Sequence, residues 1–357
     1  MRWGWLVVLL GAAGCAEQLL YLPVGSADHG ALREAGPEPP LQLHWQQQLG
    51  AAPLGGPLVE GQLLLQMTTG PALCAFDRYS GQRLGRQGYA AQSCGPPALA
   101  GALLVLAEAG PKPALRGFDR EERQGRWSYP GLVCAPLAGR GDTLVAALSA
   151  GEVVALRAGD GAKLWQAEIE GRLWAAPALG SGTVYAGNDR GRVAALALDR
   201  GQERWQRELG GGVRALAARE DRVFVATAAG TIAALDTASG EVVWQIRLGA
   251  SPTAGMAFSG RVLAVGSVDH HVYGVALDTG QVAWQFRTGG VVRGAPAATA
   301  RTVYCGSSDG YLYALESASG RLAWKYQLDG PALQPVGLGR GLVAIATEEG
   351  TIYAFGK

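Results

Sequence analysis

Histidine is a common metal ligand, and two of the four histidines in this chain, His270 and His271, are adjacent. Two imidazoles bind one ion only when they point the same way. We expect both residues to lie on a strand, where successive side chains point to opposite faces. The pair is therefore predicted to be a solvated hairpin rather than a metal site. The sequence also contains no nucleophile–base pair with a recognisable local pattern, so no catalytic residue and no metal ligand is predicted.

Cysteine offers redox chemistry, and two of the five cysteines have matching surroundings. Cys94 and Cys134 each precede a proline by two residues, at Pro96 and Pro136, so they occupy equivalent positions in neighbouring repeat units. In an oxidising compartment such thiols can form a disulfide. The bond requires Cα atoms about 4.4–6.8 Å apart, a distance that the sequence does not fix. A disulfide and two buried free thiols are both compatible with the sequence.

The first cysteine, Cys15, follows a segment typical of secretion. Arg2 provides a positive charge and Trp5–Leu10 an apolar core, which is far shorter than the roughly 20 residues that a membrane-spanning helix needs. Residues 1–14 are therefore predicted to be a signal peptide. The small residues before Cys15 resemble the bacterial lipobox, although Ala12 stands where the consensus has leucine.

This resemblance implies a lipid on Cys15, with an ordinary cleaved signal peptide as the alternative. Ala16 after the cysteine is similar to lipoproteins that are retained in the outer membrane. Residues 15–40 carry proline, glycine and scattered charge, so they are predicted to be the lipidated N-terminus and a flexible tether. Lysine and arginine total 31 against 30 aspartates and glutamates and are dispersed, which gives no electrostatic case for nucleic-acid binding.

A tryptophan that returns every 38 to 40 residues identifies the elements that must position any site. The repeat positions are Trp127, Trp165, Trp205, Trp244, Trp284 and Trp324. Between them lie short alternating apolar runs bounded by glycine, aspartate, asparagine and serine, which predict antiparallel strands joined by tight turns. A repeat of about 40 residues with four strands is typical of a β-propeller blade. The repeat tryptophans are predicted to pack between adjacent blades.

Counting the units predicts a single propeller domain over residues 41–357, an all-β fold of eight four-stranded antiparallel blades. The first unit has Gly85 where its tryptophan is expected, and the last, 330–357, contains only three strands. The missing strand is found at the other end of the chain, around Trp45. We expect the N-terminal strand to join the last blade and close the ring, which removes the open sheet edges.

The repeats resemble a known family. The segments 234–244 and 314–324, which run from Ala-Leu-Asp/Glu through a glycine to the repeat tryptophan, are similar to the tryptophan-docking repeats of pyrroloquinoline-quinone (PQQ) propellers, the quinoprotein type. The dehydrogenases of that family carry an adjacent pair of cysteines, calcium-binding carboxylates and a catalytic aspartate on long insertions. This chain has no adjacent cysteines and no room for such insertions. The resemblance therefore implies the fold without the enzyme, and no cofactor is expected.

A lipobox, a short tether, eight compact PQQ-like blades and the lack of a cofactor together resemble the BamB family of the outer-membrane β-barrel assembly (Bam) complex. The resemblance implies a non-enzymatic scaffold lipoprotein on the periplasmic face of the outer membrane. Its partners would be the POTRA domains of the assembly barrel and unfolded outer-membrane proteins. The alternative is a lipid-anchored PQQ-like propeller with a ligand-binding, sensing or adhesive role, a degenerate quinoprotein.

The candidate partner-binding residues are Arg172, Leu173 and Trp174, where the third unit passes to the fourth. Trp174 is the one tryptophan after the signal peptide that lies outside the repeat positions. Aromatic and arginine side chains are enriched among residues that dominate binding energy at interfaces. The alternative is that Leu173 and Trp174 simply pack between blades.

The corresponding connection in the BamB family is similar in carrying leucine and arginine and in contacting a POTRA domain. Arg172 lies at the matching distance before Pro177, whereas Ile169 and Gly171 replace the leucines of the family.

Overall fold

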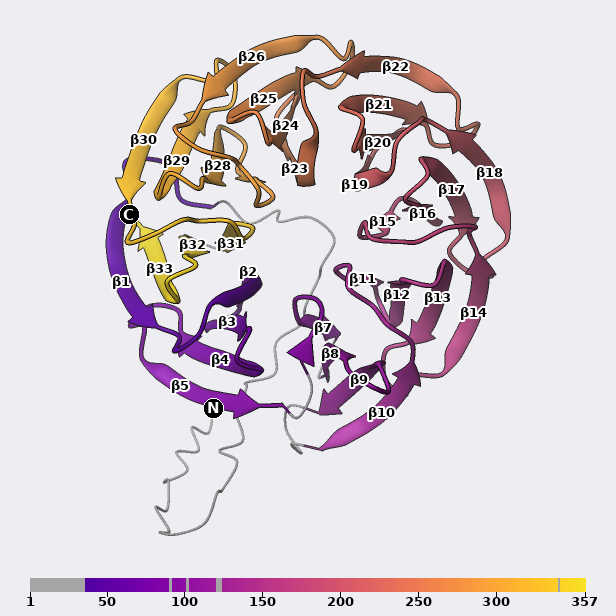
Figure 1. Ribbon diagram of the computed structural model, residues 1–357, viewed down its shortest axis with the longest axis horizontal. Coiled ribbons are helices and arrows are strands. Elements are labelled where there is room, and N and C mark those ends of the chain that lie inside the picture. The colour runs from indigo at the N-terminus through magenta and orange to yellow at the C-terminus, as the bar shows by residue number, and fades with distance from the viewer. Residues whose placement is uncertain (1–35, 90–91, 101–102, 120–123, 340) are drawn as a thin grey trace, which may run out of the picture.

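The computed structural model describes residues 36–357 except 90–91, 101–102, 120–123 and 340. In this part of the chain all regular structure is β-strand, and the strands form eight antiparallel sheets. Figure 1 shows the sheets arranged as blades around a central axis. The predicted eight-bladed β-propeller is thereby confirmed. Among the described residues, no helix has the length and apolar character needed to span a bilayer.

Within each blade the strands are ordered from the central axis outward, and they are named in that order. Blade 1 contains β2 (Pro53–Glu60), β3 (Leu63–Thr68), β4 (Ala72–Asp77) and β5 (Arg83–Gly88). In blade 2, β6 (Gln92–Ser93) and β7 (Ala98–Ala100) both pair with β8 (Leu103–Ala109), which is followed by β9 (Ala114–Asp119) and β10 (Gly125–Pro130). Blade 3 contains β11 (Ala138–Arg140), β12 (Thr143–Leu148), β13 (Glu152–Arg157) and β14 (Lys163–Glu168), and blade 4 contains β15 (Ala178–Leu179), β16 (Thr183–Gly187), β17 (Arg192–Ala197) and β18 (Glu203–Glu208).

Blades 5 to 8 follow the same order. Blade 5 contains β19 (Val213–Arg219), β20 (Arg222–Thr227), β21 (Thr231–Asp236) and β22 (Val242–Arg247), and blade 6 contains β23 (Pro252–Ser259), β24 (Val262–Ser267), β25 (His271–Ala276) and β26 (Val282–Arg287). Blade 7 contains β27 (Ala297–Ala298), β28 (Thr302–Gly306), β29 (Tyr311–Glu316) and β30 (Leu322–Gln327). Blade 8 contains β31 (Gly337–Gly339), β32 (Leu342–Ala346), β33 (Thr351–Gly356) and β1 (Gln42–Gln48).

Burial explains the composition of the strands. The second strand of a blade lies between two neighbouring blades, so both of its faces are covered: every residue of β16 is buried. The fourth strand has one face in solvent, and β18 therefore alternates, with Trp205 on the covered side between exposed Arg204 and Gln206. The continuous apolar runs and the alternating runs of the sequence thus correspond to inner and outer strands.

Alternating strand direction gives the propeller two different faces. The turns between first and second strands, and between third and fourth strands, lie on one face, which we call the inner-hairpin face. The turns between second and third strands, and the connections between blades, lie on the other, which we call the connection face. In blade 4 the turns on the inner-hairpin face are residues 180–182 and 198–202, and the turn on the connection face is residues 188–191.

Adjacent blades are fastened by the repeat tryptophans. Six indole N–H groups each donate a hydrogen bond to a carbonyl in the turn between the third and fourth strands of the next blade. The pairs are Trp45 to Arg78 (2.8 Å), Trp127 to Ala158 (2.9 Å), Trp165 to Leu198 (2.7 Å), Trp205 to Thr237 (2.9 Å), Trp244 to Leu277 (2.8 Å) and Trp284 to Ser317 (2.7 Å). The same turn carries a glycine, because a Cβ there would overlap the indole ring; at Gly240 it would lie 2.5 Å from Cδ2 of Trp205.

Among the residues that the structure describes, two blade junctions lack this hydrogen bond. Between blades 1 and 2, Gly85 occupies the tryptophan position, and leucines of both blades together with the Tyr89–Phe118 ring contact fill the interface. Between blades 7 and 8, Trp324 instead packs edge-on against Phe355, with ring centroids 5.5 Å apart. These junctions depend on apolar contact rather than on the indole N–H.

Ring closure agrees with the prediction. β1 pairs antiparallel with β33, with Gln48 opposite Thr351 and Trp45 opposite Ala354. The N-terminal strand thus supplies the outer strand of blade 8, as Figure 1 shows where the two ends of the described chain meet. Trp45 then reaches blade 1 through its bond to Arg78 O, so the closing strand contacts both neighbours.

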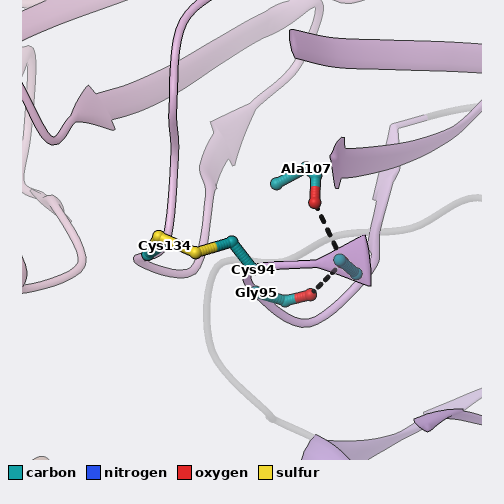
Figure 2. Close-up of a disulfide and its surroundings, with 5 residues drawn as sticks. Cys94, Gly95, Ala107 and Cys134 are labelled. Carbon is teal, nitrogen blue, oxygen red and sulfur yellow. Dashed lines mark hydrogen bonds between the residues drawn. A yellow bond between two sulfur atoms is a disulfide. The ribbon is translucent and has the colours of Figure 1, made fainter. Parts of the chain in front are cut away.

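The structure also decides between the two cysteine alternatives. Cys94 and Cys134 form a disulfide, with their Cα atoms 4.6 Å apart (Figure 2). The bridge joins the connection after β6 to the connection before β11 and so links blades 2 and 3. On the Cys94 side, Ser93 Oγ donates to Gly95 O at 2.8 Å and Cys94 N donates to Ala107 O at 3.0 Å. Cys74 and Cys305 are buried free thiols.

Alanine at Gly240 should destabilise the protein more than alanine at Gly210. Both glycines have a φ of +71°, so both substitutions carry the cost of left-handed backbone, roughly 1–2 kcal/mol. Only a Cβ at position 240 would also strike an indole, because nothing lies within 4 Å of one at position 210. Overpacking typically adds about 1–3 kcal/mol. Urea unfolding measures the difference, and equal losses would show that the contact with Trp205 has no energetic weight.

Replacing Cys94 and Cys134 together by alanine should lower the free energy of unfolding by about 2–4 kcal/mol, because the bridge restricts the unfolded chain. Chemical unfolding with and without a reductant checks this. The native protein should lose stability in reductant, and the double variant should not respond. A native unfolding midpoint that stays fixed in reductant would contradict the assignment.

Candidate functional site

The connection from β14 to β15 carries the three predicted partner-binding residues, and it is tied to the hairpin between β16 and β17. Arg172 N donates to Asp189 Oδ1 at 3.0 Å, and Asp189 N donates back to Arg172 O at 2.8 Å. Leu173 forms an isolated β-bridge with Asn188. The connection is therefore held in one conformation by its neighbour and lies on the connection face.

Asn188 links the hairpin between β16 and β17 to this connection. Its side chain is buried; Oδ1 accepts hydrogen bonds from Arg190 N at 3.0 Å and Arg192 N at 2.8 Å, and Nδ2 donates to Glu170 O. Gly171 has a φ of +107°, and a Cβ there would lie 2.8 Å from Asp189 Oδ1. The asparagine, the aspartate and the glycine together fix the path of the backbone on which Arg172 and Trp174 stand.

Burial separates the three predicted residues. Leu173 is fully buried in the cluster between blades 3 and 4, so it supports the connection from beneath. Trp174 is 45% exposed, and it is the only exposed tryptophan among the described residues. Arg172 is also exposed. The expectation of packing between blades thus describes Leu173, whereas Arg172 and Trp174 face solvent.

Of the two arginines near Trp174, Arg190 forms an ion pair with a described residue and Arg172 does not. Arg190 forms an ion pair with Glu170, and both side chains are largely exposed, so the pair adds little stability. The guanidinium of Arg172 makes no hydrogen bond or ion pair with any residue that the structure describes. An unpaired cation two residues from an exposed indole is a combination typical of protein interfaces.

Potential metal ligands do not gather in the described ranges. No group of three or more histidines, cysteines, aspartates and glutamates is placed there to hold a metal ion. His270 lies in a turn with a φ of 71°, and His271 starts β25, where its Nδ1 lies 3.0 Å from Asp269 O. The two imidazoles are thus on a hairpin, and the nearest partner of His271 is a backbone carbonyl.

Burial raises the pKa values of several thiols and phenols. Burial raises the pKa of the Cys305 thiol to about 12, and burial also raises the pKa of Cys74. Burial and the hydrogen bond from Tyr273 to Asp269 raise the pKa of that phenol to about 12. A thiol or phenol with such a pKa remains protonated at neutral pH and is a poor nucleophile or base.

The inner strands line a cavity of about 580 Å³ near the central axis. Pro96, Pro136 and Pro177 from three successive blades lie on its wall with Leu216 and Phe258, and Arg140 is the only charged residue among those that line it. The volume is that of a small-molecule site, but such sites combine apolar walls with several convergent polar groups. Only one polar side chain is present here.

Sequence patterns did not identify Asn188 and Asp189, which position the connection. The sequence does contain a signal: at the equivalent positions blade 5 has Thr227 and Ala228, whereas blade 4 has Asn188 and Asp189, whose side chains accept backbone hydrogen bonds. The predicted lipidation residue, Cys15, and the signal peptide lie outside the described residues. Of the expected tether, residues 36–40 are described, and Gly36 and Pro37 are buried against the propeller.

Comparison with known proteins places this geometry in context. The sequence profile of a family described as outer membrane protein assembly factor BamB matches residues 42–246 and 228–357. No curated protein sequence matches the chain. Among solved structures, BamB from Moraxella catarrhalis is similar with a TM-score of 0.74 at 17% identity, covering 89% of this chain and 100% of that chain.

Two further structures share the fold. The computationally designed Ika8 protein aligns with a TM-score of 0.77 at 17% identity, over 87% of this chain and 98% of that one. A quinohemoprotein alcohol dehydrogenase, ADHIIG from Pseudomonas putida HK5, aligns with a TM-score of 0.74 at 12% identity, over 88% of this chain and 76% of that one. At these identities the likeness establishes the propeller fold alone.

Proposed function

Because the chain belongs to the outer membrane protein assembly factor BamB family, we propose that it is a non-enzymatic scaffold of the outer-membrane β-barrel assembly complex. The scaffold is held at the periplasmic face of the outer membrane by a lipid on Cys15. It binds the POTRA domains of the assembly barrel and assists the insertion of unfolded outer-membrane proteins.

The compartment is supported by the disulfide. Cys94 and Cys134 lie close enough to bridge, and such bonds persist in oxidising compartments such as the periplasm. The two other cysteines of the propeller are buried and so are protected from exchange. This pattern fits a protein that folds after export.

The docking surface consists of Arg172 and Trp174. The observation that carries the proposal is the exposure of Trp174 on a connection whose backbone is fixed by Asn188 and Asp189. A rigid aromatic anchor loses little conformational entropy on binding, and the neighbouring guanidinium offers a charge-assisted hydrogen bond. Leu173 contributes indirectly, by filling the space beneath the connection.

A second function is favoured by the cavity of about 580 Å³ on the axis. In that case the protein is a lipid-anchored PQQ-like propeller that binds an apolar ligand. Native mass spectrometry of the protein from membranes separates the two functions: a stoichiometric small molecule supports the ligand-binding propeller, and co-purified assembly barrel supports the scaffold.

Reversing the charge at position 172 should abolish docking without unfolding the propeller. Arg172→Glu and Trp174→Ala are each expected to weaken association with the assembly barrel by more than about 2 kcal/mol, at least 30-fold in affinity. The matched control is Arg293→Glu, an exposed arginine on the same face in the connection from blade 6 to blade 7. Co-purification from membranes and unfolding curves are measured together. Intact binding by both variants in folded protein would refute the docking surface.

Cys15→Ala should remove lipid attachment, because the thiol of this residue is the only acceptor in the lipobox-like segment. Metabolic labelling with palmitate should disappear, and the protein should no longer sediment with outer membranes. Labelling that persists in the variant would favour an ordinary signal peptide.

A further inference from the structure

The described chain does not begin with a free end at β1. Before β1, residues 36–41 cross the inner-hairpin face over blades 7 and 8. The carboxylate of Glu38 accepts hydrogen bonds from Thr299 Oγ1 at 2.6 Å and from Thr302 Oγ1, which flank the turn between β27 and β28. Tyr304, fully buried in β28, donates its hydroxyl hydrogen bond to Pro37 O.

Apolar contact adds to these hydrogen bonds. A Cβ at Gly36 would overlap the side chains of Leu338 and Thr299, so the backbone lies directly on blades 7 and 8. Leu41 is 6% exposed and belongs to the same apolar cluster as Phe355, against which Trp324 packs. The six residues therefore contact blade 7, blade 8 and the strand that closes the ring.

Of the two junctions that lack the indole hydrogen bond within the described chain, this segment lies over the one between blades 7 and 8. In six junctions the indole N–H binds a carbonyl in the turn between the third and fourth strands of the next blade. In blade 8 the third strand is β33 and the fourth is β1, so no turn joins them. Trp324 consequently meets aromatic rings instead of a turn carbonyl, and within the described chain no indole hydrogen bond holds blade 7 to blade 8.

We propose that residues 36–41 are a clasp, an intramolecular interaction surface that replaces the missing turn and fastens blade 7 to the closing strand. Closure of the ring then depends on the N-terminal extension as well as on the β1–β33 pairing. Gly36 lies on the inner-hairpin face, and Arg172 and Trp174 lie on the connection face. The clasp therefore attaches the extension to the face opposite the docking surface; this last consequence, unlike the clasp itself, rests on the proposed function.

The repeat supplies a matched control for the test. Blade 4 carries the same Thr-Val-Tyr sequence as blade 7, so Tyr185 occupies in β16 the position of Tyr304 in β28, and both side chains are buried. Tyr304→Phe removes the hydroxyl that binds Pro37 O, whereas Tyr185→Phe removes one that has no contact with the extension. Glu38→Ala removes the carboxylate, and Glu203→Ala, an exposed residue of β18, controls for charge.

Amide hydrogen exchange of the full chain measures the effect. Tyr304→Phe should make residues 36–48 exchange about fivefold faster, because one hydrogen bond of ordinary strength is lost there. Glu38→Ala removes the acceptor of two hydrogen bonds and should speed exchange at least as much. Blades 3 to 5 should be unaffected, and the two controls should match the native protein throughout. Unchanged exchange over residues 36–48 in both clasp variants would overturn the proposal.

A cross-linking experiment covers the case in which the clasp variants fold poorly. Glu38→Cys combined with Thr299→Cys should be joined by a short bis-maleimide cross-linker, which spans the separation expected for two residues whose native side chains are in hydrogen-bond contact. The control pair, Glu38→Cys with Thr183→Cys, places the second cysteine in blade 4 and should remain unlinked. Peptide mapping identifies the bonds, and an unlinked 38–299 pair in soluble protein would overturn the clasp. Neither readout uses the assembly barrel, so failure of the clasp is distinguishable from failure of the docking surface.

Discussion

The structure depends on the contact between an outer-strand indole and the turn of the next blade. A four-stranded sheet exposes two apolar faces and cannot bury them alone, so each blade is stable only against its neighbours. The indole covers apolar surface and satisfies its N–H on a backbone carbonyl that would otherwise face the interface. The indole ring packs directly against the glycine of that turn, as Trp205 does against Gly240. The small residue opposite, Ala195, leaves room for it within its own blade.

Where this contact is missing, other interactions take its place. The first blade has Gly85 instead of an indole, and its interface with blade 2 is filled by leucines. Blade 2, whose inner edge is divided between β6 and β7, is additionally joined to blade 3 by the Cys94–Cys134 disulfide. At the closing blade, hydrogen bonds to Glu38 and Pro37 hold the chain ahead of β1. Ring integrity is thus distributed over several kinds of fastening.

The features that point to recognition lie on the connection face. In the described part of the chain no group of three or more histidine, cysteine and acidic side chains is placed to hold a metal ion, and the buried thiols and phenols have raised pKa values. The connection face presents side chains on backbone fixed by hydrogen bonds, of which the Arg172–Trp174 connection is the example with an exposed indole. The chain as a whole belongs to the outer membrane protein assembly factor BamB family.

The sequence shows the repeat because a tryptophan recurs in seven of the eight blades and its turn glycine in six, so spacing alone predicted eight blades and the closing role of Trp45. Residue type also drew attention to Arg172 and Trp174. Spacing along the chain carries no distance across blades, and therefore only the tertiary structure decided that Cys94 and Cys134 are bonded. Likewise it buried Leu173 while exposing Trp174, since burial depends on which blade lies alongside. The contacts of Glu38 with Thr299 and Thr302 join residues more than 250 positions apart, and no local pattern encodes such a pairing.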